Sequence, residues 1–118
     1  MAFINVLLAE DEALIRFVIS EELRELGWEI TEVGTADEGI RAIRRGERFD
    51  LIITDINMPG TTTGLDLAKE VRSVDPNAKI AIMTGRPAGE AADLCDLYLK
   101  KPFLEVGSLF QRLMVDAA

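Results

Sequence analysis

Short, continuous apolar runs alternate along this chain with longer stretches in which apolar residues recur every three or four positions. Continuous runs are typical of strands covered on both faces of a parallel sheet, and the three-to-four spacing is typical of helices with one buried face. The runs occupy residues 4–9, 51–54 and 80–83, and residues 96–99 are predicted to form a further buried strand. Residues 28–33 instead alternate apolar with polar positions, which predicts an edge strand with one solvated face.

The helical stretches carry recognisable end signals. The first, with apolar positions from Ile15 to Leu26, is followed by Gly27, which stands where a helix C-terminus favours a left-handed residue. The segment TADE at residues 35–38 has the spacing of an N-terminal capping box, for a short helix that ends near Gly46. A third helix is expected to end at Asp75-Pro76, because the residue before a proline disfavours helical conformation.

Strands and helices therefore alternate, and a last helix is predicted over residues 106–113. Alternation of this kind implies right-handed crossovers, so we predict an α/β fold: a doubly wound, five-stranded parallel sheet with helices on both faces. One connection has a weak helical signal. Gly85, Pro87 and Gly89 leave only residues 90–96 for a shortened fourth helix of two turns at most. No linker or repeat interrupts the pattern, so we expect one domain over residues 1–118.

Composition excludes several classes of function. The chain holds 13 Lys and Arg against 21 Asp and Glu, a formal charge of −8, which disfavours direct binding to nucleic acid or to an anionic membrane surface. No His is present, which excludes Ser-His-Asp and Cys-His nucleophiles and His-ligated zinc. Any chemistry must therefore rest on carboxylates, hydroxyls or Lys.

The sequence favours a soluble, cytoplasmic protein. Cys95 is the only Cys, so no disulfide can form within the chain and nothing points to an oxidising compartment. The apolar N-terminal stretch lacks basic flanks and runs into acidic residues, unlike a signal peptide. The longest uncharged run, residues 56–65, is far shorter than the ~20 residues that span a bilayer.

Chemically active residues follow the predicted strands, at the edge where open α/β sheets bind ligands. Glu10 and Asp11 follow the first strand, Asp55 the third, Thr84 the fourth and Lys101 the fifth. Carboxylates gathered at one edge repel one another, so a cation is expected among them. Oxygen ligands without His or thiolate favour a hard ion, and we predict Mg²⁺.

A carboxylate beside Mg²⁺, a hydroxyl and a Lys is suited to accepting a phosphoryl group. Asp55 lies between the other groups in chain order and is the best candidate for the nucleophile. The alternative is that the acids only cap helices, as Asp11 or Glu12 can do at the start of the first helix. Because four strand ends carry a carboxylate, a hydroxyl or a Lys, the pattern favours a functional site over this alternative.

Four segments of the sequence resemble the receiver domains of two-component response regulators. They are VLLAEDE at residues 6–12, DLIITDINMPG at 50–60, IAIMTGR at 80–86 and YLKKPF at 98–103. The resemblance extends over essentially the whole chain, and the motifs are highly specific as a set. It implies the flavodoxin-like receiver fold with strand order 2-1-3-4-5, which agrees with the elements predicted above.

The resemblance also assigns roles at the acidic edge. Asp55 corresponds to the phosphoacceptor. The implied Mg²⁺ ligands are Asp55, Asp11 directly, Glu10 through a water molecule and Asn57 through its backbone carbonyl.

Three further residues match the family's switch. Thr84 corresponds to the hydroxyl that turns toward the phosphoryl group, Lys101 to the lysine at that site and Tyr98 to the aromatic residue whose rotamer reports the switch. The implied partners are a histidine kinase or histidine phosphotransfer protein as donor, and a downstream protein target.

The sequence also departs from the family pattern. Glu10 stands where the family more often has Asp, which is expected to alter the metal geometry slightly without loss of function. The loop from Gly60 to Gly64 is one residue longer than usual and lacks the usual acid before its second Gly. We interpret its three threonines as a surface loop, because a phosphate-binding P-loop requires a Gly-rich turn and a following Lys.

The sequence favours one of three functions that an acidic sheet edge could serve. The leading hypothesis is a stand-alone receiver, a signalling domain that assists only its own phosphorylation and dephosphorylation. A small Mg²⁺-dependent phosphatase with an Asp nucleophile would need a second catalytic Asp where Asn57 stands. A structural module that has lost phosphorylation would be expected to lack some of the acids, Thr84 or Lys101, yet all are retained.

Overall fold

The computed structural model describes residues 4–84, 94–100 and 107–116, which form alternating strands and helices. The strands are β1 (Asn5–Ala9), β2 (Glu29–Val33), β3 (Leu51–Asp55), β4 (Lys79–Thr84) and β5 (Leu97–Lys100). The helices are α1 (Ala13–Glu25), α2 (Ala36–Arg44), α3 (Gly64–Val74) and α5 (Gly107–Asp116). Each strand begins and ends within one residue of its predicted bounds.

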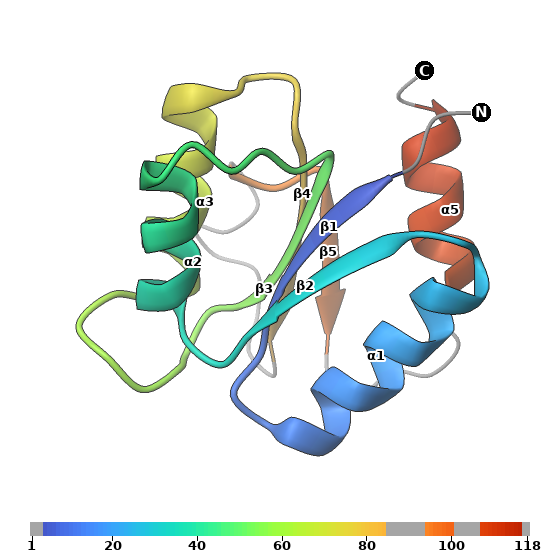
Figure 1. Cartoon of the computed structure of the whole chain (residues 1–118), viewed down its shortest axis with the longest axis horizontal. Helices are drawn as coiled ribbons and strands as arrows, with labels where there is room; N and C mark the ends of the chain where they lie inside the picture. Colours follow the sequence, from blue (N-terminus) through green and yellow to red (C-terminus); the bar gives the residue numbers. More distant parts are fainter. Residues whose placement is uncertain (1–3, 85–93, 101–106, 117–118) are drawn as a thin grey trace.

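The five strands pair in parallel in one sheet, in the order β2-β1-β3-β4-β5. This confirms the predicted doubly wound fold. Figure 1 shows α2 and α3 on one face of the sheet and α1 and α5 on the other. Because helices cover both faces, a ligand reaches the strands most readily at the edge formed by their C-terminal ends.

Two apolar clusters fill the spaces between the sheet and the helices. Leu7 and Ile52 belong to the cluster on the side of α2 and α3, and the next residues, Leu8 and Ile53, to the cluster on the side of α1 and α5. All four are fully buried. Successive strand residues point to opposite faces, so a strand covered on both sides is apolar throughout.

The helix ends follow the predicted signals, with one correction. Gly27 and Gly46 have φ angles of 85° and 97°, the left-handed conformation expected after α1 and α2. At the start of α2 the Thr35 side chain accepts the Glu38 N–H, but this bond is one-sided. The reciprocal capping box forms instead at the start of α3, where Thr63 and Asp66 each bond to the backbone of the other.

Two predictions concern residues outside the described ranges. The shortened fourth helix is predicted over residues 90–96, of which 90–93 lie outside the described ranges, and Lys101 lies within the undescribed residues 101–106. Both therefore stay predictions. Among the residues that the structure describes, no helix combines the length and the apolar composition needed to cross a bilayer.

Candidate functional site

The parallel register brings the predicted site residues to one edge of the sheet. Ala9 of β1 pairs with Thr54 of β3, so the residues that follow, Glu10 and Asp55, lie at the same level of neighbouring strands. Thr84 ends β4, the strand on the other side of β3. Residues far apart in the chain are therefore neighbours in the fold.

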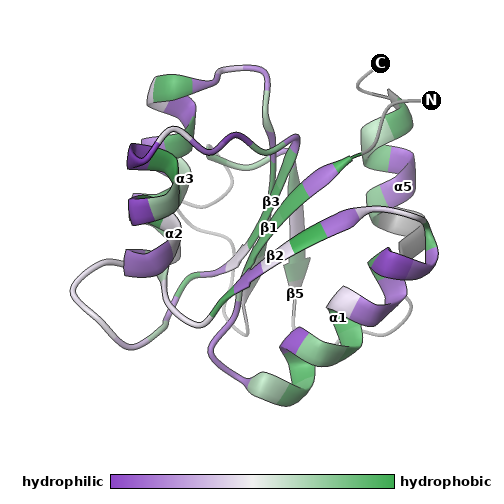
Figure 2. Cartoon of the chain, viewed as in Figure 1, coloured by the Kyte–Doolittle hydropathy of each residue, from purple (hydrophilic) through white to green (hydrophobic). Residues whose placement is uncertain are grey.

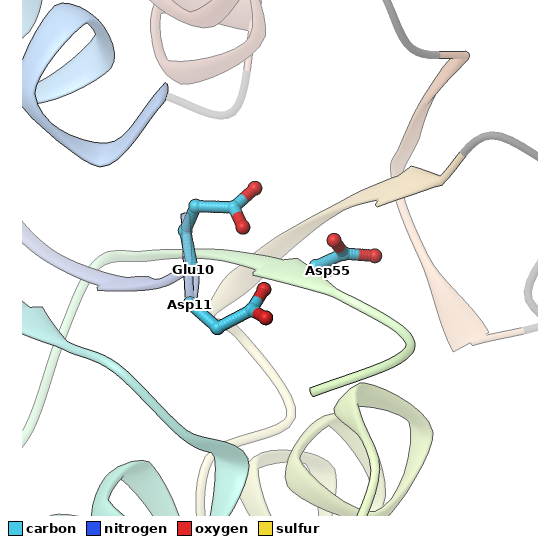
Figure 3. Close-up of side chains that lie close together, drawn as sticks. All are labelled: Glu10, Asp11 and Asp55. Carbon is cyan, nitrogen blue, oxygen red and sulfur yellow. The ribbon is translucent and has the colours of Figure 1, made fainter. Parts of the chain in front are cut away.

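Glu10, Asp11 and Asp55 form a cluster of carboxylates (Figure 3). Each offers one carboxylate oxygen, and these three oxygens all lie within 4.8 Å of one another. Glu10 is fully buried and Asp55 is 8% exposed, while Asp11 is open to solvent. Because negative charges at this separation repel one another, the cluster favours a bound cation. Its oxygen-only ligands fit Mg²⁺.

Hydrogen bonds fix Glu10 at the end of β1. Its N–H donates to the Val33 carbonyl (3.1 Å), and its own carbonyl accepts from the Arg16 guanidinium (2.7 Å). Its carboxylate accepts the Glu12 N–H (3.0 Å). Glu12, not Asp11, is the N-cap residue of α1, and its side chain forms no cap bond. The structure therefore gives no support to the alternative that Asp11 or Glu12 caps α1.

Asp55 is fixed by the chain that follows it. Its Oδ1 accepts the Ile56 N–H (2.7 Å), and the Ile56 carbonyl accepts the Gly64 N–H at the start of α3 (2.8 Å). A Cβ built on Gly64 would lie 1.8 Å from the Asp55 carbonyl oxygen. Only glycine fits there, so the second Gly of the loop has a steric role that no pattern in the sequence signals.

The structure describes three other predicted site residues, Thr84, Tyr98 and Asn57. Thr84 is 1% exposed, and Tyr98 is half-buried in β5, where it pairs with Ile82 of β4. Asn57 is exposed in the loop after β3. Lys101 is outside the described residues.

Asp37, in the first turn of α2, contacts the loop that follows Asp55. One carboxylate oxygen accepts the Thr61 N–H (3.0 Å) and the other accepts the Thr62 N–H (2.9 Å). The hydroxyls of both threonines donate to Asp37 as well. No local pattern signals this contact, because Asp37 and Thr61 are 24 residues apart.

Fold and acidic cluster agree with the result of a comparison with known families. Residues 6–113 match the family model for the response regulator receiver domain. The chain belongs to the receiver-domain family. Receiver domains serve phosphorelay signalling in two-component systems, and this establishes the general class of function.

Curated relatives agree with this assignment. The receiver domain is 42% identical over 111 residues to the transcriptional regulatory protein PdtaR of Mycobacterium tuberculosis, covering 84% of this chain and 50% of that protein. It is 34% identical over 105 residues to the probable transcriptional regulatory protein TcrX of the same species, covering 85% of this chain and 44% of that protein. The chain thus spans about half the length of these curated relatives.

Solved structures share the fold of this receiver domain. Response regulator TrrA from Thermotoga maritima, in complex with Mg²⁺-BeF, aligns over 98% of this chain and all of its own, with a TM-score of 0.81 and 30% identity. The receiver domain of a sensor histidine kinase from Pseudomonas aeruginosa aligns over 98% of this chain and 97% of its own, with a TM-score of 0.78 and 27% identity. That structure has a magnesium ion coordinated in its active-site cleft.

Proposed function

We propose that this receiver domain accepts a phosphoryl group on Asp55 from a phosphohistidine of a histidine kinase or histidine phosphotransfer protein. The observation that carries the proposal is the carboxylate cluster, in which Asp55 lies beside Glu10 and Asp11. A carboxylate oxygen of Asp55 forms the new P–O bond while the P–N bond of the phosphohistidine breaks. The imidazole leaves with the bonding electron pair and takes up a proton, and Asp55 becomes an acyl phosphate.

The proposed Mg²⁺ ligands are Asp55, Asp11, the Asn57 carbonyl and, through water, Glu10. When bound, Mg²⁺ offsets the negative charge on the transferring phosphoryl oxygens. The Glu10 carboxylate is buried and held by the Glu12 N–H, which suits a ligand that acts through water. Asp11 is exposed, which suits direct contact with the ion.

Thr84 and Lys101 are proposed to bind the phosphoryl group once it is on Asp55. The Thr84 hydroxyl and the Lys101 ammonium donate hydrogen bonds to its oxygens, and these new contacts favour the active conformation. The position of Thr84 supports this role, because it ends the strand next to β3. Tyr98 changes rotamer when these hydrogen bonds form. Its movement alters a surface to which a downstream protein binds.

A donor protein must bring its phosphohistidine to the same edge of the sheet. α1 begins two residues after Asp11, and Leu14, Phe17 and Val18 on its first turns are 75%, 58% and 47% exposed. Figure 2 shows hydrophobic residues at this end of α1. Their spacing places them on one helix face, and exposed apolar stripes beside a site are typical of protein contacts. We therefore place the docking surface of the donor here.

The phosphatase alternative has no comparable support. Neither the family match nor the relatives named above favour it. Asn57 occupies the position where such an enzyme needs its second Asp. An amide cannot exchange protons as a general acid or base, so catalytic turnover is disfavoured.

A small phosphodonor such as acetyl phosphate tests the proposal without knowledge of the kinase. In the presence of Mg²⁺, intact-mass measurement should show one added phosphoryl group on the parent chain and none on Asp55→Asn. Asp50→Asn is the matched control, because Asp50 is exposed just before the other end of β3. Equal labelling of Asp55→Asn and the parent would refute the assignment.

A further inference from the structure

The Asp37 side chain links the loop between β3 and α3, residues 56–63, to α2 by hydrogen bonds. Both carboxylate oxygens of Asp37 accept hydrogen bonds from this loop, from the N–H groups and hydroxyls of Thr61 and Thr62. These bonds favour the charged carboxylate and lower the pKa of Asp37, chiefly through the Thr62 hydroxyl and next through the Thr61 N–H. At neutral pH Asp37 is therefore ionised and can accept all of them.

Close packing restricts both partners of the contact between Asp37 and the loop. Gly60 has a φ of 122°, and a Cβ there would lie 2.7 Å from an Asp37 carboxylate oxygen. Ala36, beside Asp37, is fully buried, and a Cβ on Gly39 would lie 3.1 Å from the Leu67 side chain of α3. The first turn of α2 is thus packed firmly on α3. Asp37 therefore connects the loop to a helix turn that is itself held in place by packing.

The same loop carries a proposed metal ligand. The Gly64 N–H donates to the Ile56 carbonyl (2.8 Å) and closes the loop at its base. Asn57 lies between this closed base and the part that Asp37 holds. Fixing a loop before the ion binds removes the entropy cost of ordering it on binding, so it raises affinity.

We infer that Asp37 is a positioning residue of the magnesium site, holding Thr61 and Thr62 so that the loop presents the Asn57 carbonyl to the ion. The inference rests on the proposed function, because it concerns the same metal site. Asp37 touches neither the ion nor the phosphoryl group and acts only through the loop. Substitution of a residue that supports a metal ligand from outside the coordination shell commonly lowers metal affinity by about 10- to 100-fold.

Asp37→Asn tests the inference, with Glu38→Gln as the matched control because Glu38 is the neighbouring exposed acid on the same helix turn. Isothermal titration calorimetry measures the Kd for Mg²⁺, and phosphorylation by acetyl phosphate is followed against Mg²⁺ concentration. We expect Asp37→Asn to raise the Kd and the half-saturating Mg²⁺ concentration about tenfold or more. The rate at saturating Mg²⁺ should stay close to that of the parent, and Glu38→Gln should change neither quantity.

Thr62→Val keeps the test decisive if Asp37→Asn does not fold, because it removes one hydroxyl donor and leaves Asp37 in place. It should shift the Kd in the same direction by a smaller factor. An unchanged Kd in folded Asp37→Asn, even with lower stability toward urea, would overturn the inference and show a purely structural contact. Failure of the proposed function gives a different result, because the parent chain itself would then bind no Mg²⁺ or accept no phosphoryl group on Asp55.

Discussion

Asp11 is the exposed member of the carboxylate cluster, so its charge can be removed without leaving a buried group unpaired. We expect Asp11→Asn to raise the Kd for Mg²⁺ at least tenfold, or about 1.4 kcal/mol, because a direct ligand is lost. Titration calorimetry measures this change. Glu21→Gln, which removes one charge from an exposed position on α1, should leave the Kd nearly unchanged. Equal weakening by both variants would indicate a general effect of net charge and contradict a ligand role.

Gly64 decides how closely α3 can approach the acceptor. A side chain at this position would overlap the Asp55 carbonyl oxygen, so Gly64→Ala must push α3 and β3 apart. We expect the free energy of unfolding to fall by about 1–3 kcal/mol, the usual cost of overpacking, as measured by urea denaturation. Gly34→Ala is the control, because a Cβ there would meet only the end of the Arg16 side chain at 3.8 Å. A loss no larger than that of the control would contradict the steric role.

At the scale of the helices, α1 has two apolar faces, of which one is buried against the sheet and the other carries exposed side chains. Ile19 and Leu23 are buried against the sheet, whereas Phe17 lies on the exposed stripe. We expect Phe17→Ser to slow phosphotransfer from a cognate phosphohistidine protein at least about tenfold, because aromatic residues often dominate binding energy at interfaces. Transfer from acetyl phosphate should not change, because a small donor needs no docking surface.

The control for this prediction is Val74→Ser, at the C-terminal end of α3, where the side chain is 40% exposed. It should leave transfer from both donors unchanged. If Phe17→Ser slowed both donors equally, the substitution would be acting on the acceptor site itself, and α1 would not be the docking surface.

The contact between α2 and the loop after β3 should also respond to pH. The pKa of Asp37 is lowered in the folded chain, so its stabilising contribution is fully present above the unfolded pKa, about 3.9, and is lost as the pH falls through the lower folded value. We therefore expect the difference in unfolding free energy between the parent and Asp37→Asn to be constant near neutral pH and to shrink below about pH 4. Urea denaturation at a series of pH values measures it. A difference that stays constant well below pH 4 would contradict the contact.

For the molecule as a whole, the inner strands β1, β3 and β4 could be predicted because burial on both faces leaves an apolar run inside each of them. Leu51–Asp55 is buried at every position, and the sequence is apolar up to Thr54 for this reason. The order of the strands followed from the resemblance to the receiver family rather than from any periodicity. In the edge strand Glu29–Val33, the partly buried Ile30 and Val33 pack against the clusters on opposite faces of the sheet, and the other residues are exposed. The prediction of one solvated face is therefore wrong.

The part of the candidate site that lies at the ends of neighbouring parallel strands could be predicted, because the topology of the sheet alone brings those residues together. Glu10 and Asp55 follow parallel strands, so they could be grouped without any knowledge of contacts. Asp37 could not be grouped with them, because its contact with Thr61 joins a helix start to an irregular loop 24 residues away. The close approach of Gly64 depends on how α3 packs at the end of β3, which no local pattern encodes.

The most direct test of the central claim is to locate the phosphoryl group on the chain. Borohydride reduces an aspartyl phosphate to homoserine, and peptide mass spectrometry then identifies the residue that was modified. After phosphorylation with Mg²⁺ present, we expect homoserine at position 55 and none in a sample treated without phosphodonor. Homoserine at another carboxylate of the cluster, or at none, would contradict the account.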